Sequence, residues 1–355
     1  MSSSDRNRRQ TMLMWIDGFD HYTAVGQSGA VVQKYLEAAN YTVRNAAANT
    51  FAVVDGRITG QRALQFSVPA NTTTVPSLSW GYTPAVGATK IVFGFAIKAT
   101  GARMRVCRIE GGVLDLDWDA TTGKLKIGST LGASVLILNA WYFIEVVLDT
   151  TANTITVFAN DEQQLSVPMT TAPSNPVTIT WGQTATQTAA GVQVIDDLYV
   201  LDNASGTRID RLGPCSVNTR FPTADITTQW TIVPNGANPA PTNHYDVAAQ
   251  LAPLETNKPY LQSNVNGNTD EFRSNAVLPN SNTIYGVGLV ALARKGDLDD
   301  RKLGLKLTVS GTSDEKQLAL IESNKYLQTT YETPPGGGTW SQNAVESATF
   351  GIVTR

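Results

Sequence analysis

Apolar and polar residues alternate along much of the chain with a period of two, which is the pattern of β-strands that have one buried face. Segment 140–149 carries apolar side chains at every second residue from Tyr142 to Leu148. The polar turn that follows returns the chain into a second alternating segment, 154–160, so the two can cover the same core. The pattern predicts a β-hairpin inside a layered β-domain.

Further strand patterns recur at short intervals and are separated by turn residues, which is typical of an all-β sandwich. They lie at 63–68, 91–97, 114–128, 192–202, 283–293, 302–309 and 349–354. Segment 192–202 is apolar on both faces, so we expect it to be a central or closing strand. The loop at 294–301 mixes charges of both signs and is interpreted as a solvated hairpin loop.

Two short segments have helical rather than strand spacing. Residues 28–39 place apolar side chains on one side after a possible N-cap, Ser28. A helical turn is expected after Asn343, with Glu346 in the capping-box position.

The chain has 355 residues, which at about 150 residues per domain predicts two domains. The pair Gly213-Pro214 breaks the preceding strand, and we place the boundary there. The predicted parts are a flexible N-terminal arm at 1–11, a first β-sandwich domain at 12–212, and a C-terminal β-sandwich at 213–355. Within the last of these, 233–268 is rich in Pro and Asn and is expected to be a long loop.

Composition narrows the functional classes. Charged residues make up 16% of the chain and the net charge is −3, so there is no basic field for nucleic acid. The longest apolar run, 135–148, is interrupted by Asn139 and Glu145, so no membrane insertion is expected. The only cysteines, Cys107 and Cys215, lie far apart, which excludes a cysteine-based metal knuckle and favours free buried thiols.

Three acidic residues, Asp115, Asp117 and Asp119, are spaced by two and share one face of a predicted strand. Alternating acids on a jelly roll can serve as the nucleophile and the general acid of a glycosidase, or can hold calcium. A turn sequence follows directly, in which Asp commonly caps its own backbone. We therefore expect a solvated strand end, with no cofactor, no metal and no catalytic residue, and keep the three acids as weak metal candidates.

A second acidic pair, Asp196 and Asp197, is expected to face opposite sides of its strand. The inward carboxylate should accept hydrogen bonds from the backbone or a tyrosine of segment 15–22, because a buried carboxylate needs partners. The chain contains two histidines and lacks the motifs of nucleophilic triads and of zinc hydrolysis, so it is not expected to be an enzyme.

Aromatic residues offer candidates for stacking on a sugar ring. Trp80 and Tyr82 lie between prolines in a loop-like stretch, and Trp181 stands beside a Thr-rich run. The alternative is that these rings are buried beneath the loops or at a subunit contact.

The order of several segments resembles one known group of proteins. The first part resembles the concanavalin A-like (laminin G-like) jelly roll, and nearly the whole chain is similar to exterior virion proteins of tailed bacteriophages. The similar segments are WIDGFDHY at 15–22, GRITGQRALQF at 56–66, IDDLYVLD at 195–202, FPTADITTQWT at 221–231, RKGDLDDRKLGLKL at 294–307 and YETPPGGGTWSQNAVESATFG at 331–351. The acidic loop cluster of calcium-binding laminin G-like domains has no counterpart here.

This resemblance implies a structural protein of the virion exterior, in the tail, collar, fibre or capsid decoration, assembled in the host cytoplasm. It would act through contacts with other copies of itself and with other virion proteins. Scattered anchors in 233–268 would reach a neighbouring subunit, namely Tyr245, Leu251, Leu254 and Tyr260. The alternative is a carbohydrate-binding module for adsorption to a host-surface glycan, and a glycan depolymerase is the weakest of the three hypotheses.

Overall fold

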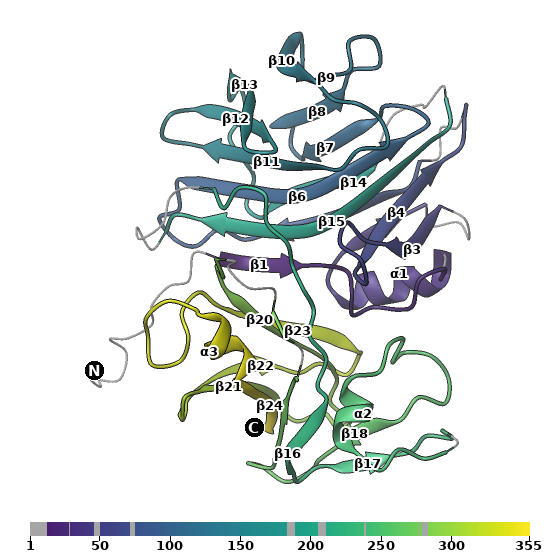
Figure 1. Cartoon of the computed structure of the whole chain (residues 1–355), viewed down its shortest axis with the longest axis vertical. Coiled ribbons are helices and arrows are strands. Elements are labelled where there is room, and N and C mark those ends of the chain that lie inside the picture. Colours follow the sequence, from purple (N-terminus) through teal and green to yellow (C-terminus); the bar gives the residue numbers. More distant parts are fainter. Residues whose placement is uncertain are drawn as a thin grey trace. The chain divides into compact units, whose positions relative to one another are not determined.

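The computed structural model describes residues 13–27, 29–45, 50–71, 75–182, 189–204, 211–237, 239–275, 277–278 and 283–355. The expected N-terminal arm and the possible cap Ser28 lie outside these ranges. The described residues form two compact units, and each is all-β with only short helices (Figure 1). The first unit comprises 13–20, 25–37 and 41–218, and the second comprises 21–24, 38–40 and 219–355.

The first unit contains two antiparallel sheets. Sheet A has eight strands in the order β13-β12-β11-β6-β15-β4-β3, and β1 pairs with the C-terminal part of β15. The strands of sheet A are β1 (Leu13–Asp17), β3 (Phe51–Asp55), β4 (Arg62–Val68), β6 (Lys90–Thr100), β11 (Tyr142–Asp149), β12 (Thr154–Ala159), β13 (Glu162–Pro168) and β15 (Gly191–Asp202). The predicted hairpin is therefore confirmed as β11 and β12, and β15 is a central strand as expected.

Sheet B has seven strands in the order β10-β9-β8-β7-β14-β5-β2. Its strands are β2 (Thr42–Arg44), β5 (Ser77–Tyr82), β7 (Arg105–Ile109), β8 (Leu114–Trp118), β9 (Lys124–Ile127), β10 (Thr130–Val135) and β14 (Val177–Gly182). The predicted helix is present as α1 (Gly29–Ala38). The all-β sandwich expected from the sequence is confirmed.

The alternation in β6 shows how the sequence builds the core between the sheets. Phe95 points inward and meets the Trp181 ring of sheet B edge-on, at 5.6 Å between ring centroids. On the opposite face, Gly94 leaves room for the Tyr199 ring, since a Cβ at this glycine would lie 2.1 Å from that ring. The small residues of β6 therefore allow a second layer to approach the outer face of sheet A.

That second layer is the chain segment that leaves the jelly roll. Glu145, at the centre of the outer face of sheet A, is fully buried and accepts hydrogen bonds from the Tyr199 hydroxyl and from Gly213 N. Arg211 forms an ion pair with Glu145 and stacks over Phe158, 3.7 Å from the ring centroid. The outer face of sheet A is thus covered within the first unit.

The second unit contains a five-stranded antiparallel sheet, in the order β16-β19-β24-β21-β22, and two two-stranded sheets, β17-β18 and β20-β23. Buried side chains of β21 and β23 share a core with Trp340. The elements are β16 (Ala224–Thr228), β17 (Thr231–Val233), α2 (His244–Ala248), β18 (Tyr260–Gln262), β19 (Thr269–Arg273), β20 (Val287–Ala293), β21 (Lys302–Val309), β22 (Thr312–Ala319), β23 (Lys325–Tyr331), α3 (Gln342–Glu346) and β24 (Thr349–Thr354).

Three local expectations differ from the structure. The loop at 294–301 does not close a hairpin, because β20 pairs with β23 whereas β21 pairs with β22 and β24. Helix α3 is capped by Ser341, whose side chain accepts from Ala344 N, so it begins before Asn343. Segment 213–218, which we assigned to the second domain, belongs to the first unit.

The segment 233–268 is also not one long loop. It contains α2, and its strand β18 pairs with β17 through Ile232 and Leu261. The carboxylate of Asp225 accepts from His244 N and Tyr245 N at the start of α2. Local polar contacts of this kind give a segment structure that its lack of periodicity conceals.

Candidate functional site

The three aromatic candidates for sugar stacking are buried. Trp80 and Tyr82 are each 6% exposed and Trp181 is fully buried, because β5 and β14 turn these side chains into the sandwich. Trp80 and Tyr82 stack on each other at 6.1 Å, and the Tyr82 hydroxyl donates to Asp202. The expectation that they stand in loops is wrong, and no ring face is open to a sugar.

The acidic run DLDWD begins on β8, where its side chains point alternately into the core and out of the sheet, as predicted. Leu116 and Trp118 point into the core, with Trp118 only 3% exposed, whereas Asp115 and Asp117 point out of sheet B. Asp119 lies beyond the strand and accepts from Thr122 N at 2.8 Å and from the Thr122 hydroxyl at 2.7 Å. These hydrogen bonds lower the pKa of Asp119, and the expected turn cap is confirmed.

Arginines from the neighbouring strand face the two outward carboxylates. Arg108 of β7 binds Asp115 with two hydrogen bonds, Nε to Oδ1 at 2.6 Å and Nη2 to Oδ2 at 3.0 Å. Arg105 donates from Nε to Asp117 Oδ1 at 3.2 Å and also lies 3.5 Å from Asp115 Oδ1. Burial alone would raise the pKa of Asp115, but the Arg108 hydrogen bond and both guanidinium charges lower it overall.

The polar side chains continue across sheet B as a row. The strand register places Ser79, Thr180, Arg108 and Asp115 opposite one another on β5, β14, β7 and β8. The Ser79 and Thr180 hydroxyls lie 2.8 Å apart, and the Thr180 hydroxyl donates to Glu110 Oε1 at 2.7 Å. A second row places Arg105, Asp117 and Lys126 opposite one another on β7, β8 and β9. We call the residues of the two rows, Ser79, Thr180, Arg105, Arg108, Asp115, Asp117 and Lys126, the sheet B polar face.

The backbone of Arg105 accepts a hydrogen bond from a side chain of sheet A. β7 contains a bulge between Arg105 and Cys107, which inserts Val106 into the pairing with β8. Gln193 of β15, only 1% exposed, crosses the interior and donates from Nε2 to the backbone oxygens of Arg105 and Val106, at 3.1 and 3.2 Å. Since buried carbonyls need donors, Gln193 stabilises the bulge that turns Arg105 outward.

Sequence reasoning found the acids of this face but missed their partners. The signal was present, because the short segment with Arg105 and Arg108 is followed by a glycine-containing turn and then by the DLDWD run. A hairpin over this stretch places Arg108 opposite Asp115. Ser79, Thr180 and Gln193 come from distant parts of the chain, and no local pattern relates them to the acids.

No metal site was found at these acids. The part of the chain that the structure describes contains no group of three or more His, Cys, Asp or Glu side chains able to hold a metal ion. At the polar face the physical reason is the pairing with arginine, because a guanidinium occupies the carboxylate oxygens that a cation would need.

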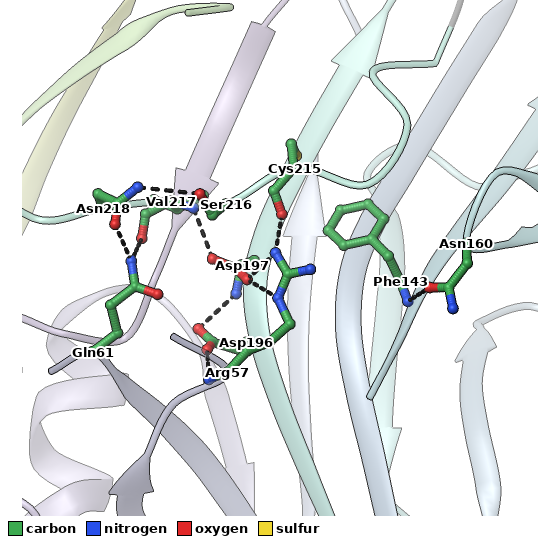
Figure 2. A network of polar contacts seen from close by, with 10 residues as sticks. All are labelled: Arg57, Gln61, Phe143, Asn160, Asp196, Asp197, Cys215, Ser216, Val217 and Asn218. Carbon is green, nitrogen blue, oxygen red and sulfur yellow. Dashed lines mark hydrogen bonds and ion pairs between the residues drawn. The ribbon is translucent and has the colours of Figure 1, made fainter. Parts of the chain in front are cut away.

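The second acidic pair anchors the segment that follows the jelly roll (Figure 2). Asp197 accepts from Val217 N at 2.7 Å and forms an ion pair with Arg57 at 2.7 Å, while Arg57 also donates to Cys215 O. Asp196 accepts from Arg57 N at 2.9 Å and from Asp197 N at 2.8 Å. Burial and the neighbouring Asp197 charge raise the pKa of Asp196 to about 8.

This arrangement corrects the expected geometry of the pair. β15 has an irregular register between Asp196 and Tyr199, and Asp197 has a φ of 53°. Both carboxylates are therefore buried, at 1% and 0% exposed, instead of facing opposite sides. Arg57 and Val217, which lie outside the expected segment 15–22, supply hydrogen bonds to the pair, so the site holds the chain together and presents no carboxylate to solvent.

Both cysteines are free thiols. Cys107 is buried and Cys215 is half-buried, and burial raises the pKa of each.

The residues expected to be assembly anchors lie in the second unit. Tyr245, Leu251 and Leu254 are half-buried, and Tyr260 is 44% exposed. No helix among the described residues is long and apolar enough to cross a membrane.

Comparisons with known proteins give distant structural likenesses only. No protein-family model matches the chain, and no curated protein does. A sialidase is similar with a TM-score of 0.36 and 10% identity over 52% of this chain, which spans only 18% of the sialidase chain. The alginate lyase AlgAT5 from polysaccharide lyase family 7 has a TM-score of 0.34 and 11% identity, over 47% of this chain and 95% of its own.

A third similar structure is the carbohydrate recognition domain of Emp47p, with a TM-score of 0.29 and 9% identity, over 43% of this chain and 89% of its own. These structures are named for carbohydrate-acting enzymes and for carbohydrate recognition, and the findings provide no evidence of a phage protein. They contradict the prediction of a virion structural protein that acts through assembly contacts. We therefore withdraw that interpretation, together with the assembly role given to 233–268.

Proposed function

We propose that the first unit is a carbohydrate-binding module and that the sheet B polar face is its binding surface. The observation that carries this proposal is the group of partly exposed hydrogen-bonding side chains Arg108, Asp115 and Asp117 on the neighbouring strands β7 and β8. Thr180 of the same row is only 2% exposed and its hydroxyl donates to Glu110, so it belongs to the support beneath this surface. On sheet A, the outer face around Glu145 is covered by Arg211 and Gly213, so this part of the sheet is closed to a ligand.

The spacing of these side chains suits the hydroxyl groups of a sugar. Neighbouring strands lie about 4.8 Å apart, so Arg108 on β7 and Asp115 on β8 offer donors and acceptors side by side. Hydroxyl groups both donate and accept, and they can use guanidinium N–H groups and carboxylate oxygens at the same time. Asp115 and Asp117, with side chains 44% and 43% exposed, are open to such a ligand.

The module is proposed to bind without cleaving. Glycoside hydrolysis needs one carboxyl group with a raised pKa to act as the general acid. Asp115 has a lowered pKa, and Asp117 is occupied by Arg105. The ligand of such a module would be a glycan of a host surface.

A pair of variants of the full chain tests this function. Replacing Arg108 and Asp115 together by Leu removes both partners at once and leaves no unpaired charge. The matched control replaces Lys90 and Asp149 together by Leu. These two residues form an ion pair of sheet A, with 3.4 Å between their charged atoms. On a glycan array and by calorimetry, wild type and control should bind the same saccharide, and the Arg108→Leu, Asp115→Leu variant should lose at least tenfold in affinity. Equal binding by all three proteins would place the binding surface elsewhere.

A further inference from the structure

We propose that the sheet B polar face selects an uncharged, hydroxyl-rich saccharide and discriminates against saccharides that carry carboxylates. This inference rests on the proposed carbohydrate-binding function and adds the chemical class of the ligand. It follows from how the charges of the face are already paired.

The four central charges of the face form a closed set. Arg108 directs the edge formed by Nε and Nη2 at Asp115, with two hydrogen bonds of 2.6 and 3.0 Å. Arg105 directs its Nε at Asp117 at 3.2 Å and lies 3.5 Å from Asp115. Two guanidinium groups thus face two carboxylates, and their charges cancel. Lys126, the other cation of this face, forms an ion pair with Asp119 at 3.7 Å.

A carboxylate on a ligand would have to compete with this pairing. Guanidinium groups bind carboxylates best through two parallel N–H donors on one edge, and Asp115 already occupies such an edge of Arg108. The incoming group would also approach two carboxylates on the same strand face, where like charges repel. An acidic saccharide therefore gains little from the arginines and is repelled by the aspartates.

Hydroxyl groups meet no such barrier. Each guanidinium has five N–H donors, of which Arg108 uses two on Asp115, and each carboxylate oxygen can accept more than one hydrogen bond. The remaining donors and acceptors lie side by side at fixed positions, because the salt bridges hold the side chains. Neighbouring hydroxyls of one sugar can therefore donate to Asp115 while accepting from Arg108.

The experiment compares two classes of ligand on the full chain. Gluco-, manno- and galacto-hexaose are titrated against hexamers of mannuronate, guluronate and galacturonate, at low and at physiological ionic strength. We expect at least one neutral hexaose to bind with an affinity that does not depend on salt, and every uronate to bind at least tenfold more weakly. A uronate that binds more tightly than all neutral sugars, with an affinity that falls as salt rises, overturns this inference and leaves carbohydrate binding intact. Binding of neither class overturns both.

A single substitution sharpens the test. Asp115→Asn releases the Arg108 edge, so affinity for uronates should rise at least fivefold and acquire a salt dependence. Asp149→Asn is the control, because it releases Lys90 on sheet A in the same way and should change neither affinity. If Asp115→Asn does not fold, Asp117→Asn removes one of the two carboxylates that repel an acidic ligand, and the affinity for uronates should again rise. Unchanged uronate affinity in a folded variant of either kind overturns the inference.

Discussion

The segment 213–218 should determine whether the jelly roll is stable on its own. We compare two fragments, 13–212 and 13–218, which differ by these six residues. The shorter fragment loses three hydrogen bonds to charged groups. They are Gly213 N to Glu145 at 3.0 Å, Val217 N to Asp197 at 2.7 Å, and Arg57 to Cys215 O.

The expected loss can be estimated from these contacts. A hydrogen bond to a charged group contributes about 1.5–3 kcal/mol, so three of them contribute roughly 5 kcal/mol even at the low end. Single domains have unfolding free energies of about 5–15 kcal/mol, so the loss is comparable with the whole stability of the fragment. The fragment 13–212 should therefore be unfolded or marginal, whereas 13–218 should unfold cooperatively.

Urea unfolding followed by tryptophan fluorescence measures the difference. A fragment that ends at residue 223 is the length control, since it keeps the same three hydrogen bonds as 13–218, and it should match 13–218. Midpoints for 13–212 and 13–218 that agree within error would refute the reasoning, because the buried Asp197 and Glu145 would then not need these partners.

Three further predictions concern single buried groups. Because the pKa of Asp196 is raised to about 8, the folded protein holds a proton that the unfolded chain has lost. The stabilisation by this bound proton is complete below about pH 4 and is lost as pH rises through 8. The urea midpoint of the wild type should therefore fall from pH 5 to pH 9, and that of Asp196→Asn should fall less. An equal fall in the two proteins would contradict this prediction. Gly94→Ala should destabilise by about 3 kcal/mol or more, because its Cβ would lie 2.1 Å from the Tyr199 ring, and Tyr199→Leu should restore part of the loss in a double-mutant cycle. Gln193→Leu should cost about 2 kcal/mol by leaving two bulge carbonyls without their donor. Because the Arg105 charge helps to lower the pKa of Asp115, NMR should show that this pKa rises when the bulge loosens, and the cavity variant Val194→Ala of the same strand should leave it unchanged.

Local alternation predicted several strands and the faces that they bury. The alternation in 302–309 and in 91–97 predicted β21 and β6, because a side-chain period of two reflects the pleat of the strand and needs no knowledge of the partner. The same local rule divided the DLDWD run into buried Leu116 and Trp118 and outward Asp115 and Asp117. It also showed, from the turn residues that follow, that Asp119 caps its own backbone.

Pairing between distant strands was decided only by the tertiary structure. The loop 294–301 has the composition of a hairpin loop, yet β20 and β21 enter different sheets, since strand pairing depends on which surfaces remain to be covered. Trp80 and Trp181 were placed in loops because prolines and threonines flank them, whereas the pairing of β5 with β14 turns both rings into the core.

The candidate site divides along the same line. Local periodicity identified its acids, but their electrostatic state was set by Arg105 and Arg108 on β7, and the outward position of Arg105 depends on Gln193, 88 residues away. The sequence predicts that Asp196 and Asp197 point to opposite faces of their strand. In the structure an irregularity in β15 buries both of them, against Arg57 and the segment after the jelly roll. A chain's local pattern fixes which side chains leave a strand on which face, whereas charge pairing and pKa depend on atoms that only folding brings within a few ångströms.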